Sequence, residues 1–237
     1  ISPEYELSQR AQRERESRDR RRKLEVLAAS DAPKSLDNAW NALAHSDPFL
    51  QSASLAAIEH HPPVKLGNIA AVPLLPRQQH LETRQRAMEL LALARTAGPA
   101  ESKQVYDGLA SMLESGRPDA NDTQIVVLRA LQLAFIRIGA EDEVKNRFRT
   151  QLEGCYPART FPENYLLCEL LVYLNSPKVI APTLKLLAAV KKQEEQMFYI
   201  YTLRNLDHGW SLEQRREFLA SVKKMDGYEG SSYMQRF

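Results

Sequence analysis

The chain contains 237 residues, of which 43% are hydrophobic and 26% are charged, and its 32 basic and 30 acidic side chains give a formal net charge of +2. These values are typical of a folded globular protein and exclude wholesale disorder or a collagen-like class. The balance of charges also excludes nucleic-acid or membrane binding driven by the field of the whole molecule, so any such role has to be local.

Helix-forming residues dominate the composition, and only nine residues are Gly. This composition favours an all-α fold. No apolar stretch reaches the ~20 residues that a helix needs to cross a bilayer, and no signal peptide opens the chain. We therefore expect no membrane span and no targeting signal within this chain.

The N-terminal segment is highly charged. Residues 10–23 read RAQRERESRDRRRK, with eight basic and three acidic residues and only one apolar residue. Without a hydrophobic stripe, this segment predicts either a solvated helix, stabilised by Glu and Arg at helical spacing, or a linker. At Leu24 a spacing of three and four between apolar residues begins. The expected division is therefore a basic charged helix or linker at 1–23 and a helical repeat domain at 24–237.

From Leu36 onward, apolar residues recur with helical period in segments of ten to eighteen residues that are separated by turn signals. The stretch 69–79, which contains two Pro residues, interrupts the series and is expected to be an irregular connector. The other segments group into five predicted helical hairpins. These are 36–43 with 48–60, 81–95 with 105–113, 125–138 with 144–152, 162–174 with 179–190, and 194–206 with the helix after Ser211.

Capping signals support these boundaries. The run Ser46-Asp47-Pro48 predicts an N-cap followed by proline in the first helical turn. Gly139 is expected to stop the helix before it. The run Thr160-Phe161-Pro162-Glu163 and the pair Ser211 and Gln214 each have the pattern of a capping box, so each predicts a helix start.

The hairpins start near residues 36, 81, 123, 162 and 194, which is roughly the ~40-residue period of HEAT-like arrays. The fold class that we predict is therefore an all-α, HEAT-like α-solenoid of about five antiparallel helical hairpins. The alternative is a helical bundle with other connectivity, because the intervals are uneven.

Aromatic residues are concentrated in the C-terminal fifth of the chain. Trp210 precedes the Ser211 cap, where a large apolar residue can pack on the first turn of the next helix as a hydrophobic staple. The other aromatic residues predict either core packing at the end of the array or an interaction surface. They are Phe198, Tyr199, Tyr201, Phe218, Tyr228, Tyr233 and Phe237.

The sequence contains no recognisable catalytic, cofactor-binding or metal motif. It has no HExxH, CxxCH, GxSxG or phosphate-loop pattern, and its five His are expected to cap helix ends or to be exposed. Two Cys are too few for a disulfide framework or a four-ligand zinc site, and Cys168 is expected to be a small buried hydrophobe. We therefore predict no catalytic residue, no cofactor-binding residue and no metal ligand, and we expect the chain not to be an enzyme.

Four strings, taken in order, resemble the HEAT-repeat region of the large PVC-type haem-binding proteins of planctomycete-like bacteria. The resemblance covers residues 22–237 and is most specific in the last string, at Leu203-Arg204, Gly209-Trp210 and Gln214-Arg215-Arg216. The strings are WNALAHSDPFLQSASLAAIEHHP, TQIVVLRALQLAFIRIG, YPARTFPENYLLCELLVYLNSPKVIAPTLKLL and EEQMFYIYTLRNLDHGWSLEQRREFL.

In that family a sugar-dehydrogenase-like β-propeller usually precedes the helical region and a cytochrome c domain with CxxCH usually follows it. The resemblance implies a spacer in an exported, periplasmic or secreted haem-binding redox protein, with catalysis and haem outside this chain. Its partners would be flanking redox domains or another protein.

Two further hypotheses come from the residues themselves. The chain can be a stand-alone HEAT-like binding protein whose basic N-terminal segment engages an anionic partner, or an enzyme with an unfamiliar site between helices. Salt-dependent binding to a polyanion would favour the binding protein. Nucleic acid is not the expected partner, because acids are interleaved with the N-terminal arginines and no aromatic residue accompanies them.

Overall fold

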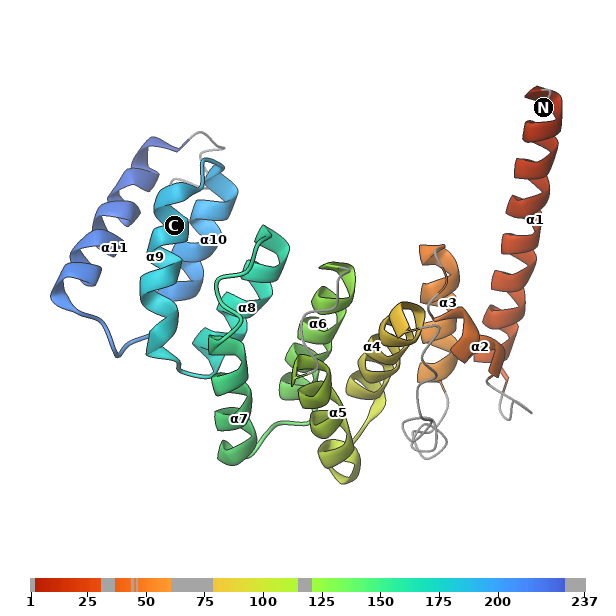
Figure 1. Cartoon of the computed structure of the whole chain (residues 1–237), viewed down its shortest axis with the longest axis horizontal. Coiled ribbons are helices and arrows are strands. Elements are labelled where there is room, and N and C mark those ends of the chain that lie inside the picture. The colour runs from red at the N-terminus through yellow and green to blue at the C-terminus, as the bar shows by residue number, and fades with distance from the viewer. Residues whose placement is uncertain are drawn as a thin grey trace. The chain divides into compact units, whose positions relative to one another are not determined.

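The computed structural model describes residues 3–30, 37–43, 45, 47–60, 79–114 and 121–228, and these residues form an all-α structure of eleven α-helices without a strand (Figure 1). Their contacts divide the chain into two compact units, Ile1–Gly139 (unit 1) and Ala140–Phe237 (unit 2). None of the described helices is both long enough and apolar enough to span a membrane. The all-α prediction is confirmed.

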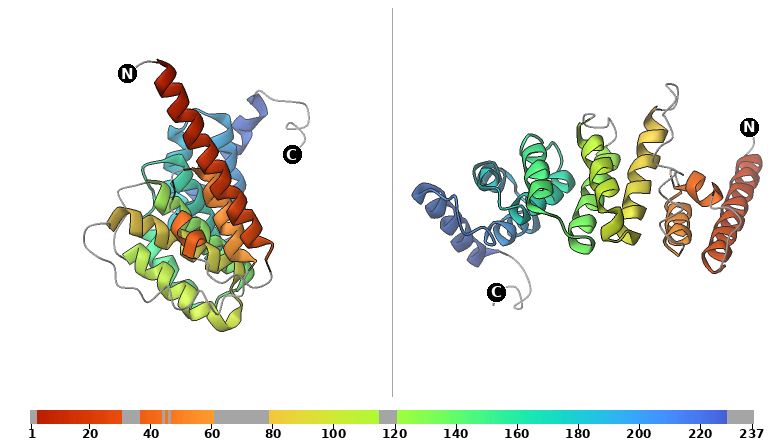
Figure 2. Two further views of the ribbon diagram at one scale, coloured as in Figure 1. Left: turned by 90° about the vertical axis from the view of Figure 1, so that its right-hand side faces the viewer. Right: turned by 90° about the horizontal axis from the view of Figure 1, so that it is seen from below.

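In unit 1, α1 packs against α3, and α4 packs against both α5 and α6. The views in Figures 1 and 2 agree that α1 and α3 lie side by side. The core consists of aliphatic side chains such as Leu50, Leu90, Leu109 and Leu131, all at most 1% exposed. The helices of unit 1 are α1 (Pro3–Ala28), α2 (Asp37–Ala42), α3 (Pro48–Glu59), α4 (Gln79–Thr96), α5 (Ser102–Glu114) and α6 (Asn121–Arg137), with a short 3₁₀ turn η3 (Pro99–Glu101).

In unit 2, α10 packs against α8 and α9, and α11 packs against α9. Phe148, Leu167 and Tyr199 are fully buried in its core. The elements of unit 2 are α7 (Asp142–Glu153), α8 (Phe161–Tyr173), η4 (Pro177–Val179), α9 (Ile180–Ala189), α10 (Gln193–Leu203), α11 (Leu212–Lys224) and η5 (Met225–Gly227). The predicted pair of 125–138 with 144–152 is divided between the two units, because its helices are α6 and α7.

The charged N-terminal segment is helical, which decides between the two predicted forms. Helix α1 spans residues 23 and 24 without a break. Two ion pairs between residues one turn apart stabilise this exposed helix. Arg10 lies 3.2 Å from Glu14, and Arg21 lies 3.2 Å from Glu25. Leu24 is buried, whereas most side chains of residues 10–23 are exposed.

The predicted helix starts are confirmed where the structure describes them, but only one of the two predicted capping boxes is complete. Asp47 caps α3, and Pro48 occupies the first helical position. Thr160 caps α8, but the Glu163 carboxylate accepts from the Thr160 hydroxyl at 2.8 Å rather than from its backbone N–H, so the reciprocal half of the box is missing. Ser211 and Gln214 make the complete capping box of α11. Gly139 follows α6 with φ of +74°, a conformation that favours glycine.

A buried polar cluster holds α8 and α9 of unit 2 together. The Tyr156 hydroxyl lies 2.7 Å from the Thr183 hydroxyl, which donates to the Val179 carbonyl at 2.6 Å. The Cys168 thiol lies 3.8 Å from the same Thr183 oxygen and is completely buried. Burial raises the pKa of this thiol to about 11, so it stays protonated, and the prediction that Cys168 is a buried core residue is confirmed.

One buried carboxylate makes the stability of unit 1 depend on pH. Glu89 on α4 is 7% exposed, and burial raises the pKa of its carboxyl despite attraction from Arg86 and hydrogen bonds from Gln85 and Arg86. A raised pKa in the folded state means that the associated stability is present below the unfolded pKa and is lost as the pH rises through the folded pKa. The charged form therefore costs stability at neutral pH.

We expect Glu89→Gln to raise the melting temperature at pH 7 by about 2 to 4 °C, the shift that ~1 kcal/mol produces in a domain of this size. The gain should disappear near pH 4, where the parent carboxyl is protonated as well. Thermal unfolding of the parent and the variant across this pH range measures the effect. An equal gain at both pH values would show that burial of charge is not its cause.

Candidate functional site

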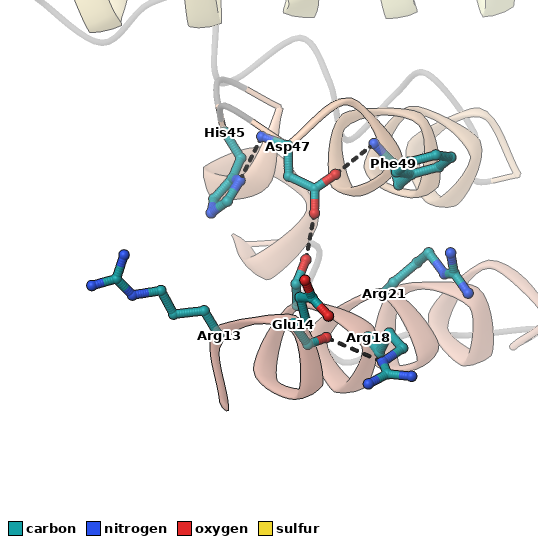
Figure 3. A pocket seen from close by; sticks show the side chains of 8 residues that line it. Arg13, Glu14, Arg18, Arg21, His45, Asp47 and Phe49 are labelled. Carbon is teal, nitrogen blue, oxygen red and sulfur yellow. Dashed lines mark hydrogen bonds between the residues drawn. The ribbon is translucent and has the colours of Figure 1, made fainter. Parts of the chain in front are cut away.

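An open groove lies between α1 and the start of α3 in unit 1. Its volume is about 550 Å³. Figure 3 shows side chains of α1 on one side and, on the other, those of the turn before α3 and of Phe49 in its first turn. The lining residues are Arg13, Glu14, Ser17, Arg18, Arg21, His45, Asp47 and Phe49.

Helical spacing places the α1 residues in the groove. Arg13, Ser17 and Arg21 are four residues apart, so they share one face of α1, and Glu14 and Arg18 lie beside them on the adjacent row. In Figure 3, Arg13 extends to one side of Glu14, below His45, whereas Arg18 and Arg21 lie on the other side.

Both carboxylates of the groove already have hydrogen-bond donors. Glu14 accepts from the Arg10 guanidinium at 3.2 Å. Asp47 accepts from the Ser17 hydroxyl and from the Phe49 backbone N–H, the latter at 2.9 Å. These two hydrogen bonds, that from Ser17 first, lower the pKa of Asp47, so its carboxylate stays ionised.

Two of the three arginines keep their charge available for a ligand. Arg21 is paired with Glu25, but no ion pair within the described part of the chain involves Arg13 or Arg18. The Nε of Arg18 donates to the Glu14 backbone carbonyl at 3.2 Å (Figure 3). His45 accepts from the Asp47 backbone N–H at Nδ1, which leaves Nε2 as the donor nitrogen of the neutral ring. Such donors suit carboxylate or phosphate oxygens.

Ser17, Asp47 and His45 meet in the groove, but not in the order of a hydrolytic triad. A triad needs the imidazole between the nucleophile and the carboxylate. Here the Ser17 hydroxyl donates directly to Asp47, while His45 contacts the backbone N–H. The lowered pKa also makes Asp47 a weak base. The arrangement favours ligand binding over nucleophilic catalysis.

Other residues that the sequence singled out lie apart from this groove. His60 approaches the Ala56 carbonyl at 2.8 Å at the end of α3, which confirms the predicted capping role. His208 contacts Asp207 at 3.0 Å. His61 and residues 69–78 of the predicted 69–79 connector lie outside the described residues, as does the side chain of His80, whereas Gln79 is the first residue of α4. Across the described ranges, no three His, Cys, Asp or Glu side chains gather closely enough to hold a metal ion.

The sequence patterns do not predict the groove. They single out only the basic segment of α1 that forms one side of it. The N-terminal segment was singled out for its charge, and the Ser46-Asp47-Pro48 run only for its cap. The repeat of Arg13, Ser17 and Arg21 along one helix face was the available signal. Nothing in the sequence specified that this face packs beside residues 45–49.

No protein-family model, curated protein or solved structure matches this chain.

Proposed function

We propose that the chain is a non-catalytic helical scaffold and interaction domain that binds an acidic segment of a partner protein in the groove between α1 and α3. The observation that carries this proposal is that the exposed guanidinium groups of Arg13 and Arg18 line a groove of about 550 Å³ and form no ion pair with any described carboxylate. Guanidinium groups bind carboxylates through paired hydrogen bonds.

The rest of the groove supports an acidic protein segment as the ligand. Phe49 is 67% exposed at the groove, so it offers an apolar surface to a side chain that flanks the acid. The nearly balanced charge of the chain gives little long-range attraction for a nucleic acid. Recognition would therefore depend on local contacts of Arg13, Arg18 and Phe49.

We further propose that the helices form HEAT-like stacked hairpins within each unit. The supporting observation is that helices two apart in the chain pack on each other, namely α4 with α6, α8 with α10, and α9 with α11. This pattern is typical of arrays in which equivalent helices of successive hairpins stack. Such arrays commonly serve as scaffolds because they present long surfaces to partners.

The binding proposal predicts salt-dependent capture of an acidic peptide. A short fluorescein-labelled peptide of Glu and Asp residues with one Phe should bind the full chain, and its affinity should fall about tenfold between roughly 50 and 300 mM salt because screening weakens exposed ion pairs. Fluorescence anisotropy measures the affinity, and the same peptide with Lys replacing each acid is the control. Equal binding of the two peptides would contradict the proposal.

A second candidate function is a spacer within a larger exported haem-binding redox protein. The strings at Leu203-Arg204, Gly209-Trp210 and Gln214-Arg215-Arg216 favour it, because they carry the resemblance to that family. The test is the full reading frame of the gene. A signal peptide, a β-propeller upstream and a CxxCH motif downstream would support the spacer, and their absence from that frame would contradict it.

A further inference from the structure

Helix α11 in unit 2 exposes an apolar face. None of its thirteen residues is buried. Leu212 and Leu219 are 66% and 62% exposed, and Val222 is 37% exposed. Leu212 and Leu219 are seven residues apart, so they lie two turns from each other on one face, about 10 Å along the helix. Exposed apolar residues on one helix face are typical of an interaction surface, and here Arg215 and Arg216 lie between the two leucines on the same face.

A groove of about 290 Å³ borders this face at the junction of α10 and α11. The Trp210 indole N–H donates to the Leu206 carbonyl at 2.7 Å, and the Trp210 ring packs on Phe218 with the ring centroids 5.2 Å apart. Both contacts fix the aromatic wall before any partner binds, which lowers the entropic cost of binding. The groove is lined by Leu203, Arg204, Leu206, Asp207, Trp210, Arg215, Phe218 and Leu219.

The charges at the groove select an acidic partner. Arg204 is held over the Tyr201 ring, with its guanidinium carbon 3.9 Å from the ring centroid, and Arg215 projects from α11. Helix α11 carries four basic and two acidic residues. Asp207 is the one carboxylate among the lining residues, and it already contacts His208. The excess of positive charge complements carboxylates on a ligand.

We infer that the α10–α11 groove docks an amphipathic helix of a partner protein, whose apolar stripe packs on Trp210, Phe218 and Leu219 while its flanking carboxylates pair with Arg204 and Arg215. A helix fits because apolar residues at positions i, i+3, i+4 and i+7 form a stripe about 10 Å long, which can reach from Leu219 in the groove to Leu212 two turns away on the same face of α11. Trp and Arg are also among the residues that contribute most to binding energy at protein interfaces. This site is separate from the α1–α3 groove and has a different ligand geometry.

The test uses a fluorescein-labelled model peptide that is an amphipathic helix with a Leu stripe flanked by Glu, and a matched peptide with Lys at every Glu position. The Glu peptide should bind the full chain at least about tenfold more tightly than the Lys peptide, measured by anisotropy. Leu219→Asp should weaken binding at least about tenfold, because it places a carboxylate beside those of the peptide. Equal affinity for both peptides would overturn the inference that the partner is acidic.

Two control variants keep the result specific to this groove. Ile136→Asp changes another exposed apolar residue, 75% exposed on α6, and should leave binding of the Glu peptide unchanged. The double variant Arg15→Gln and Arg22→Gln removes two exposed guanidinium groups that line neither groove, and it should also leave binding unchanged. A loss of binding in either control as large as that in Leu219→Asp would overturn the inference.

Self-association is the remaining alternative, and it is measured on the same proteins. Sedimentation is measured for the parent chain and for Leu219→Asp over the same range of concentrations. The parent should not form a dimer that is lost in the variant. If such a dimer forms and the Glu peptide does not compete with it, a second copy of the chain occupies the groove, and the inference of a helical acidic partner is wrong. Circular dichroism of each variant confirms that the exposed substitutions leave the helices intact.

Discussion

Gly209→Ala is expected to lower the free energy of unfolding of unit 2 by about 2 to 4 kcal/mol. Gly209 has φ of +79°, where an L side chain costs about 1 kcal/mol. A Cβ atom at this position would lie 2.2 Å from Cβ of Pro177 and 3.3 Å from its Cα, so the two turns would have to separate at a cost of about 1 to 3 kcal/mol.

Other glycines of the chain separate the two causes. Gly139 has φ of +74°, but a Cβ atom at this position would have no neighbouring atom within 4 Å. Gly139→Ala should therefore show the backbone cost alone. Gly227 has neither constraint, and Gly227→Ala should be nearly neutral. Urea unfolding followed by circular dichroism gives the three values. If Gly209→Ala costs no more than Gly139→Ala, the contact with Pro177 does not fix the turn.

Trp210→Ala is expected to destabilise unit 2 by about 2 to 3 kcal/mol, whereas Ser211→Ala should cost about 1 kcal/mol. Trp210 is half-buried rather than fully buried, so the loss is smaller than the ~3 to 5 kcal/mol of a fully buried aromatic. Its indole packs on Phe218 and donates to the Leu206 carbonyl, and alanine removes both contacts. Ser211→Ala removes only the bond to the Gln214 N–H.

Thermal unfolding of the two single variants decides how Trp210 acts. Trp210→Phe keeps an aromatic ring but not the indole donor, so it should fall between the parent and Trp210→Ala. A Trp210→Ala protein that is as stable as the parent would mean that the ring contributes only to ligand binding. The sequence prediction that Trp210 anchors the α10–α11 turn would then be wrong.

Local signals explain why the helices could be predicted so closely from the sequence. Asp47 with Pro48, and Ser211 with Gln214, satisfy N-terminal N–H groups through residues that are three or fewer positions away. Such information is entirely local, so it does not depend on the tertiary fold. For Trp210 the structure differs from the prediction. A staple would place the ring on the first turn of α11, whereas it packs on Phe218, about one turn further along the helix.

The grouping of helices and the grooves depend on contacts between distant residues, which periodicity does not encode. The Ser17 hydroxyl meets Asp47 thirty positions later, and the Gly209 turn meets Pro177. No spacing rule links such pairs. For the same reason, periodicity predicts that 125–138 pairs with 144–152, although the structure places these two helices in different compact units.

The most direct test of the proposed function compares two double variants of α1 in the acidic-peptide titration. Arg13→Gln with Arg18→Gln removes two guanidinium groups that line the groove, and Arg15→Gln with Arg22→Gln removes two exposed ones on the same helix that do not. The net charge changes equally, so long-range attraction is matched. We predict a loss of affinity of about tenfold in the first variant and less than about twofold in the second. Equal losses in both would show that the peptide responds to charge alone, and would contradict binding in the groove.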